Sequence, residues 1–278
     1  GSSIHKMSYH TKSPSHSLSP QDQIRKDVAN RNHKFVQEFP DLISKDVHLI
    51  DNKEHDHIES ELTNSRNKPN KNCKIFVNNK STIWSAIKCH SLQYDNIYLL
   101  NFADAEKPGG GYLNGRNAQE ECLCRQTLLY PTLYGNEMYD HNIEIGPTSD
   151  YMILSKGILV IRDDDNHFLS KKDQFKVDII SSAAYDNRKP NKDSYHIMEQ
   201  RIAKIIRLAA RESLKVRGKS ALILGAFGCG VFRNDPEQVA SIFANVLNEQ
   251  GFKRYFDCVI FPIYNGHHSV DVFKSKFP

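Results

Sequence analysis

The sequence contains no run of about 18 or more apolar residues, and its start lacks the basic-then-apolar pattern of a secretory signal. We therefore predict an intracellular protein, cytoplasmic or nuclear, with no membrane partner. It also lacks a strong charge of either sign, because 37 Lys and Arg stand against 33 Asp and Glu. A formal net charge of +4 indicates a mild preference for anionic partners and does not indicate a nucleic-acid-binding protein.

Common metal and nucleotide motifs are missing as well. The six cysteines include no Cys-x-x-Cys pair and no zinc-ribbon spacing, so buried reduced thiols and no metal site are expected. No Gly-Lys-Ser/Thr completes a Walker A sequence, and no Gly-x-Gly-x-x-Gly opens a first βαβ unit. These absences argue against a nucleoside triphosphatase and a dinucleotide-dependent dehydrogenase, and we expect no cofactor.

Composition divides the 278 residues into three predicted segments. Residues 1–19, rich in Ser, His, Lys and Pro, are predicted to be a disordered tail or a remnant left by cloning. Residues 20–72 are predicted to be a helical N-terminal extension and a linker. Apolar residues recur there at helical spacing up to Pro40, and the stretch 51–72 is polar and contains a proline. Residues 73–278 are predicted to form the main domain.

Strand-like and helix-like segments alternate through this main domain. Strands are predicted at 73–77, 96–103, 157–161, 175–181, 221–224 and 256–263, and helices from Ser81, from about 193 to 216 and from Asn234. Trp84 and Ile87 are expected to face the core. The alternation predicts an α/β sandwich with a largely parallel sheet, in which ligands bind outside the carboxyl ends of the strands.

Two glycine-rich loops follow predicted strands. The first is KPGGGYLNG (107–115), and the second is GAFGCGVF (225–232). Glycines let a backbone approach a ligand closely, and successive backbone N–H groups form concave anion-binding sites. The expected ligand of these loops is therefore a phosphate or diphosphate. Either loop alone is also compatible with a simple tight turn, but two at equivalent strand ends favour a binding site.

Three polar residues, Gln119, Glu120 and Glu121, follow the first loop and precede a segment predicted to be helical. An arbitrary glutamate pair at a helix start is usually a capping or solvated pair. Here the pair is close enough to a phosphate-type loop to reach the sugar of a bound nucleotide. Glycosidic cleavage needs an acid to protonate the leaving oxygen and an anion to stabilise an oxocarbenium-like centre. Adjacent helical residues point about 100° apart, so separate roles are expected for the two glutamates.

The combination resembles a known family. Gly-Gly-Gly, a short spacer and Gln-Glu-Glu are the signature of poly(ADP-ribose) glycohydrolases, and GGGYLNGRNAQEE fits it with a seven-residue spacer. The stretches NFADAEKPGGG and LGAFGCGVFRNDP are similar to the microbial-type branch, over about residues 75–270. The resemblance implies a macrodomain-like three-layer α/β/α sandwich with a mixed, largely parallel sheet and an N-terminal helical extension. It also implies hydrolysis of ribose–ribose O-glycosidic bonds in ADP-ribose polymers, with release of ADP-ribose.

The resemblance further implies roles for individual residues. Glu121 would be the catalytic acid and base, Glu120 would hold ribose hydroxyls, and Gln119 would orient the segment. Asn101 and Asp104 would flank the ribose pocket. The remaining implied ligand contacts are Gly109, Gly110, Gly111, Gly225, Ala226, Phe227, Gly228, Cys229, Gly230, Val231 and Phe232, with Phe227 near the distal ribose and adenine near residues 261–264.

Two other functions stay open at this point. A reader that binds ADP-ribose without cleaving it would keep the glycine loops and dispense with the acid, so Glu120 and Glu121 weigh against it. A hydrolase of mono-ADP-ribosyl linkages on protein or nucleic acid would use the same contacts. The expected partners are therefore poly(ADP-ribose) or ADP-ribosylated macromolecules, and the protein is expected to be a monomer.

Overall fold

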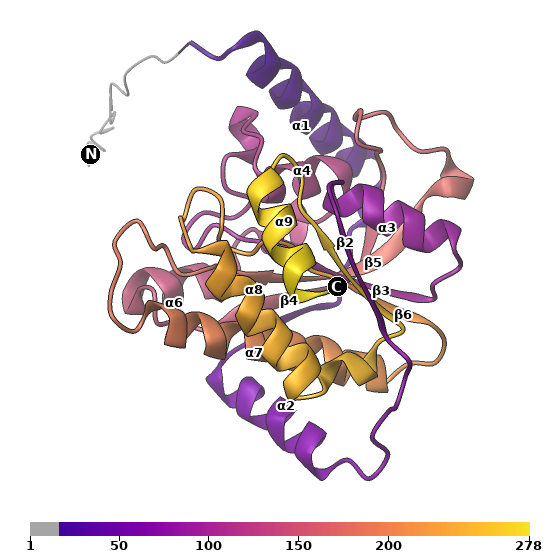
Figure 1. Ribbon diagram of the computed structural model, residues 1–278. Helices are drawn as coiled ribbons and strands as arrows, with labels where there is room; N and C mark the ends of the chain where they lie inside the picture. Colours follow the sequence, from indigo (N-terminus) through magenta and orange to yellow (C-terminus); the bar gives the residue numbers. More distant parts are fainter. Residues whose placement is uncertain (1–16) are drawn as a thin grey trace, which may run out of the picture.

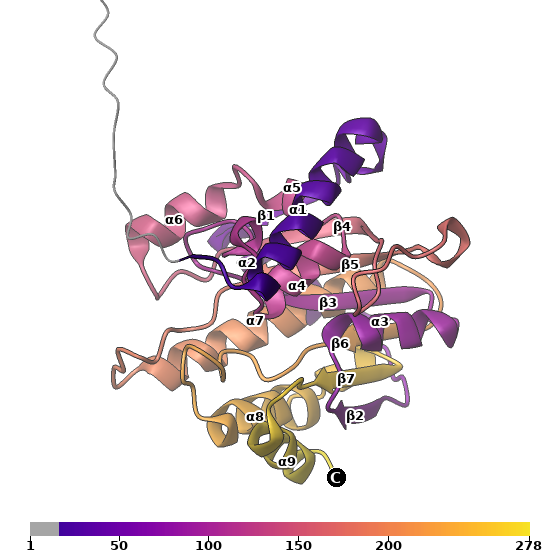
Figure 2. The same ribbon diagram turned by 90° about the horizontal axis from the view of Figure 1, so that it is seen from above.

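The computed structural model describes residues 17–278, so the predicted tail at 1–19 lies outside the described part except for its last three residues. The described residues form one seven-stranded sheet in the order β1-β4-β5-β3-β6-β7-β2 (Figures 1 and 2). The strands are β1 Val47–Ile50, β2 Lys74–Asn78, β3 Asn96–Phe102, β4 Met152–Val160, β5 Phe175–Ser182, β6 Ser220–Ile223 and β7 Cys258–Pro262. All neighbouring pairs from β5 to β2 are parallel, and β4 pairs antiparallel with both β1 and β5. The predicted mixed, largely parallel sheet is confirmed.

Helices cover both faces of this sheet. They are α1 Pro20–Glu38, α2 Asn52–Asn64, α3 Thr82–Ser91, α4 Gln119–Gln126, α5 Tyr130–Leu133, α6 Glu137–Ile145, α7 Ser194–Leu214, α8 Pro236–Ala244 and α9 His267–Lys276. Successive strand residues point to opposite faces, so Tyr98 joins a core with α2, α7, α8 and α9, whereas Leu99 joins one with α1, α3, α4, α5 and α6. The three-layer architecture is thereby confirmed. No helix within residues 17–278 is long and apolar enough to cross a membrane.

The linker predicted at 51–72 is wrong over Asn52–Asn64, which forms α2. Asp51 caps this helix by accepting a hydrogen bond from the Glu54 N–H at 2.8 Å. Ile58 and Leu62, four residues apart, form a narrow apolar stripe that packs against α7. The other faces of α2 are charged, which is why the composition resembled that of a linker. The short strand β1, which the sequence analysis missed, joins the sheet edge just before it.

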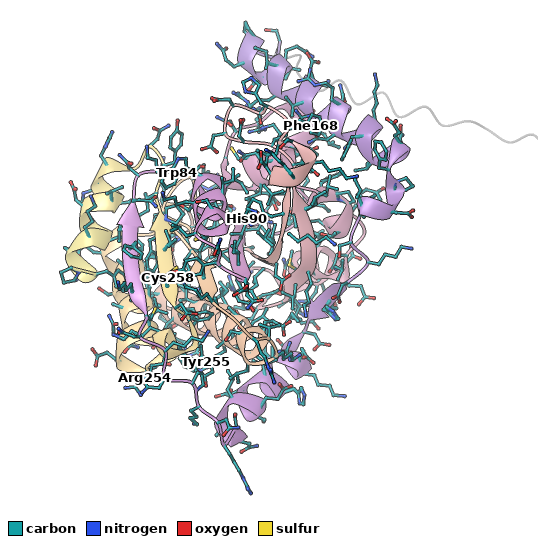
Figure 3. All side chains as sticks on the ribbon, turned by 90° about the vertical axis from the view of Figure 1, so that its right-hand side faces the viewer. Trp84, His90, Phe168, Arg254, Tyr255 and Cys258 are labelled. Carbon is teal, nitrogen blue, oxygen red and sulfur yellow. The ribbon has the colours of Figure 1, made fainter. Side chains whose placement is uncertain are left out.

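Some side chains lie differently from the prediction. Trp84 was expected to face the core but is 39% exposed, with the Lys80 ammonium 5.4 Å from its ring centroid (Figure 3). All six cysteines are free thiols, and Cys89, Cys124 and Cys258 are buried as expected. The other three are only half-buried.

Helix α1 packs across the first glycine loop. Arg25 Nε donates to the Gly115 carbonyl at 2.6 Å, and Asn32 Nδ2 donates to the Arg125 carbonyl at 2.8 Å. A Cβ placed on Gly115 would overlap the backbone carbonyl of Asp22. The N-terminal helix is therefore in backbone contact with the loop that precedes α4.

Replacing Gly115 with alanine is expected to lower the free energy of unfolding by about 3 kcal/mol, because α1 must move away. Gly135→Ala is the matched control. Gly135 has φ +76°, close to the +73° of Gly115, but an added Cβ there meets no atom within 4 Å. Its cost should be that of the left-handed backbone alone, about 1 kcal/mol. Urea denaturation of both variants measures the difference, and equal losses would contradict the packing argument.

Candidate active site

The two glycine loops follow the carboxyl ends of β3 and β6, which are adjacent parallel strands. Gly110 in the first loop and Gly225 in the second have positive φ, +56° and +137°. A Cβ on Gly225 would lie 2.9 Å from Cζ of Phe102 and 3.0 Å from the carbonyl oxygen of Pro262. Only glycine lets the second loop leave the sheet between these two strand ends. The predicted placement of both loops is confirmed.

The side chain of Gln119 links the start of α4 to β3 by hydrogen bonds. Its Oε1 accepts from the Phe102 N–H at 2.8 Å, and its Nε2 donates to the Leu100 carbonyl at 2.7 Å and to Thr82 Oγ1 at 3.2 Å. These bonds occupy both ends of the amide. The side chain therefore orients the segment that carries the two glutamates.

Glu120 is buried, with 2% exposure, beneath the first loop. Its Oε2 accepts from Asn101 Nδ2 at 2.8 Å and its Oε1 from the Asp104 N–H at 2.9 Å. Asn101 also donates to Ser181 Oγ at 3.0 Å, which fixes the amide in place. Burial raises the pKa of Glu120 to about 8, against the opposing effect of these two donors. The side chain is thus held in one position, and its raised pKa favours the protonated form near pH 7.

Glu121 is 8% exposed and lies next to Glu120 at the first turn of α4. Burial raises the pKa of its carboxyl, while backbone N–H groups and Arg125 act in the opposite direction. A Cβ on Gly110 would lie 3.2 Å from Glu120 Oε1 and 3.4 Å from Glu121 Oε2. Gly110 of the first loop therefore lies close to both acids, and a raised pKa is compatible with a carboxyl that acts as an acid near neutral pH.

The Asp104 side chain stabilises the turn at the start of the first loop. Its Oδ1 accepts from the N–H groups of Glu106 at 2.9 Å and Lys107 at 2.8 Å. The carboxylate thus holds the turn that leads into the three glycines. Its backbone N–H, rather than its side chain, reaches Glu120.

The second loop is held by a residue that the sequence analysis missed. Asn234 is 1% exposed, and its Nδ2 donates to the carbonyls of Tyr185 at 2.8 Å and Gly228 at 2.9 Å. It had been interpreted only as part of a helix start. The ring of Phe227, predicted to lie near the distal ribose, is fully buried in the core, 5.5 Å from the ring of Phe102. Elsewhere in the loop Ala226, Cys229 and Phe232 are half-buried and Gly230 and Val231 are exposed.

Comparison with known proteins identifies the family. The model of the microbial-type PARG catalytic domain matches residues 6–163, more than half of the chain. This chain belongs to the microbial-type PARG family. No curated protein sequence matches it.

Solved PARG structures have the same fold. That of the poly(ADP-ribose) glycohydrolase from Thermomonospora curvata is 27% identical with a TM-score of 0.82, covering 92% of this chain and 100% of that one. A structure of the same enzyme bound to the inhibitor ADP-HPD is 26% identical, with a TM-score of 0.79 and the same coverage. The Deinococcus radiodurans enzyme in complex with ADP-ribose is 26% identical with a TM-score of 0.72, covering 84% of this chain and 94% of that one.

In this PARG, burial of Glu120 predicts a pH-dependent stability. The folded state keeps a proton up to about pH 8 that the unfolded chain releases near its ordinary pKa of 4.5. The contribution of Glu120 to the free energy of unfolding is thus complete at low pH and is lost as the pH rises toward 8, by a few kcal/mol in all. Urea denaturation from pH 5 to 9 should show a weaker decline for Glu120→Gln than for the wild type. Parallel declines would contradict the raised pKa.

Proposed function

We propose that this PARG hydrolyses the ribose–ribose O-glycosidic bonds of ADP-ribose polymers and releases ADP-ribose, with Glu121 as its acid and base. The chain is a glycosidase of the poly(ADP-ribose) glycohydrolase type. The observation that carries the proposal is that two buried glutamates at the start of α4 lie close to Gly110 of the first glycine loop, with no room for a larger residue between them. The ADP-ribose and ADP-HPD complexes of the related enzymes support an ADP-ribose site in this fold.

The proposed reaction begins with the diphosphate against the two glycine loops. Protonated Glu121 gives its proton to the glycosidic oxygen, and the bond from that oxygen to the anomeric carbon breaks. The electron pair leaves with the oxygen, so the ribose acquires oxocarbenium character. The Glu121 carboxylate then takes a proton from a water molecule, whose oxygen attacks the anomeric carbon. Glu121 regains its proton, and one water is consumed for each bond cleaved.

Glu120 has a different role in this proposal. As a neutral acid near pH 7 it does not place a second negative charge beside Glu121, which preserves the acidic form of that residue for catalysis. Asn101 and the Asp104 N–H fix its oxygens, so it presents a rigid group to the hydroxyls of the ribose. Gln119 holds the helix start that carries both acids.

Digestion of labelled poly(ADP-ribose) tests the function. Wild-type protein, Glu121→Gln and a mono-ADP-ribosylated substrate are run in parallel, and the products are resolved. Release of ADP-ribose from the polymer by the wild type alone supports the proposal. An intact polymer with tight ADP-ribose binding would instead indicate a reader, and release from the mono-ADP-ribosylated substrate alone would indicate the other hydrolase.

A further inference from the structure

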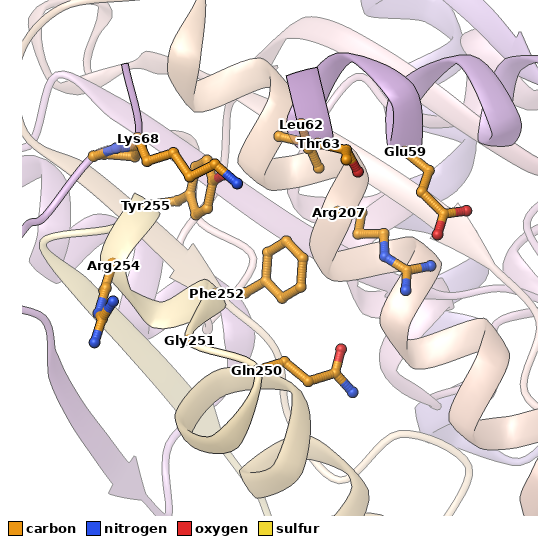
Figure 4. A pocket seen from close by; sticks show the side chains of 11 residues that line it. Glu59, Leu62, Thr63, Lys68, Arg207, Gln250, Gly251, Phe252, Arg254 and Tyr255 are labelled. Atoms are coloured by element: carbon orange, nitrogen blue, oxygen red, sulfur yellow. The ribbon is translucent and has the colours of Figure 1, made fainter. Parts of the chain in front are cut away.

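A cavity lies at the other end of the sheet from the glycine loops. It has a volume of about 300 Å³ and is formed by the end of α2, the segment after it, α7 and the turn before β7 (Figure 4). In Figure 1, α4 and the site lie toward one end of the molecule and α2 toward the other. The cavity is at the amino-terminal ends of β2 and β7, whereas the loops follow the carboxyl ends of β3 and β6. The cavity and the glycine loops therefore lie at opposite ends of the strands of the sheet.

The lining is cationic. Lys68, Arg207 and Arg254 contribute to it, and Glu59 is the one acid among the lining residues within 17–278. None of these three cations takes part in an ion pair with another described residue. Their charges are therefore available to an anion.

Arg207 differs in this respect from its neighbours on α7. One turn before it, Lys204 bonds to Asp150 at 2.7 Å, and one turn after it, Arg211 bonds to Glu54 at 2.8 Å. Arg207 is half-buried between them and lines the cavity. A guanidinium in this position offers a planar fork of donors suited to a phosphate.

Two aromatic rings lie beside these cations. Phe252 and Tyr255 are stacked, with ring centroids 5.8 Å apart and an interplanar angle of 23°. Figure 4 shows Phe252 projecting into the middle of the cavity, between Lys68 and Gln250. Figure 3 places Tyr255 beside Arg254 at one end of the molecule. Aromatic faces next to basic side chains are the combination with which proteins hold a nucleobase and its phosphate.

We propose that this cavity is a nucleotide-binding site, with the base against Phe252 and the phosphate on Arg207. A volume of about 300 Å³ is at the lower end of small-molecule sites and exceeds what a bare phosphate fills. Two sources share this chemistry: a free nucleotide, and an internal ADP-ribose unit of a polymer whose end lies in the active site. Occupation of the cavity by an internal polymer unit rests on the proposed function, whereas nucleotide binding in the cavity does not depend on it.

Photolabelling with 8-azidoadenosine 5′-monophosphate tests the binding. The full chain is irradiated with the probe, digested, and its labelled peptides are identified by mass spectrometry. Label is expected on the peptide that contains Phe252 and Tyr255, and Arg207→Gln should reduce it about tenfold. Lys172→Gln, which removes an exposed cation at another place, should leave it unchanged. Glu59→Gln removes the acid of the lining and should increase the label about twofold.

Label confined to the glycine loops, or label on residues 250–255 that Arg207→Gln does not reduce, would overturn the proposal. Thermal unfolding of each variant verifies its fold. Because labelling requires no turnover, the result is independent of whether the chain cleaves the polymer.

The kinetics of polymer cleavage distinguish the two sources. If internal polymer units occupy the cavity, Arg207→Gln should raise KM for long chains about tenfold and leave kcat and the KM for short oligomers unchanged. If Arg207→Gln reduces the photolabel but KM stays the same for long chains, the site serves a free nucleotide.

Discussion

Replacing Glu121 with glutamine is expected to lower the rate of ADP-ribose release from the polymer by about 10³-fold, the contribution of a well-placed general acid and base. Glutamine keeps the size of the side chain but can neither deliver a proton to the leaving oxygen nor take one from water. The proposed diphosphate contacts are on the glycine loops and not on Glu121, so the affinity for ADP-ribose should change by less than about threefold. Single-turnover kinetics and calorimetric titration with ADP-ribose measure the two quantities separately.

Glu106→Gln is the matched control for this experiment. Glu106 is an exposed glutamate of the same loop region, and only its backbone N–H contacts Asp104. Its replacement should leave both the rate and the affinity unchanged. Wild-type turnover by the Glu121→Gln protein would show that Glu121 is not the catalytic acid and base.

Replacing Glu120 with glutamine should lower turnover by about 10²-fold and, unlike Glu121→Gln, should also weaken ADP-ribose binding by about tenfold. Both oxygens of Glu120 face donors, Asn101 Nδ2 and the Asp104 N–H. A protonated carboxyl oxygen still has a lone pair to accept a hydrogen bond, but an amide nitrogen has none. In either orientation of the glutamine amide, its NH₂ group faces one of these two donors. The repulsion should displace the side chain that, in the proposal, faces the ribose.

The contrast between the two glutamates is the decisive readout. Loss of rate alone at Glu121 and loss of both rate and affinity at Glu120 would match their separate roles. If Glu120→Gln affected stability but neither rate nor affinity, Glu120 would be a structural residue beneath the site and its assigned contact with the substrate would be wrong.

Much of the site could be predicted because its signals are local. The apolar run of β3, the three glycines and the Gln-Glu-Glu segment lie within 26 residues of one another, at 96–121. Their relation to the sheet follows from the rule that ligands bind at the carboxyl ends of parallel strands.

The parts that were missed depend on contacts between distant segments. Asn234 holds the second loop through Tyr185, 49 positions earlier, and no periodicity indicates such a pair. The ring of Phe227 packs against Phe102 of β3, which is 125 positions earlier. Helix α2 has only a narrow apolar stripe, so its composition resembles that of a linker. The cavity around Phe252 gathers residues from several separate segments, which is a property of the fold rather than of any motif.

The order of the sheet also has a consequence for how the chain is made. Within residues 17–278, β2 has a single neighbour, β7, and the paired Val77 and Phe261 are about 180 positions apart. During synthesis on the ribosome, β2 thus emerges about 180 residues before the strand with which it forms its hydrogen bonds. In that interval Phe76, half exposed even in the finished protein, belongs to an unpaired strand that other chains can bind. Completion of the sheet therefore requires the synthesis of β7, and chains released before Cys258 would be prone to aggregate.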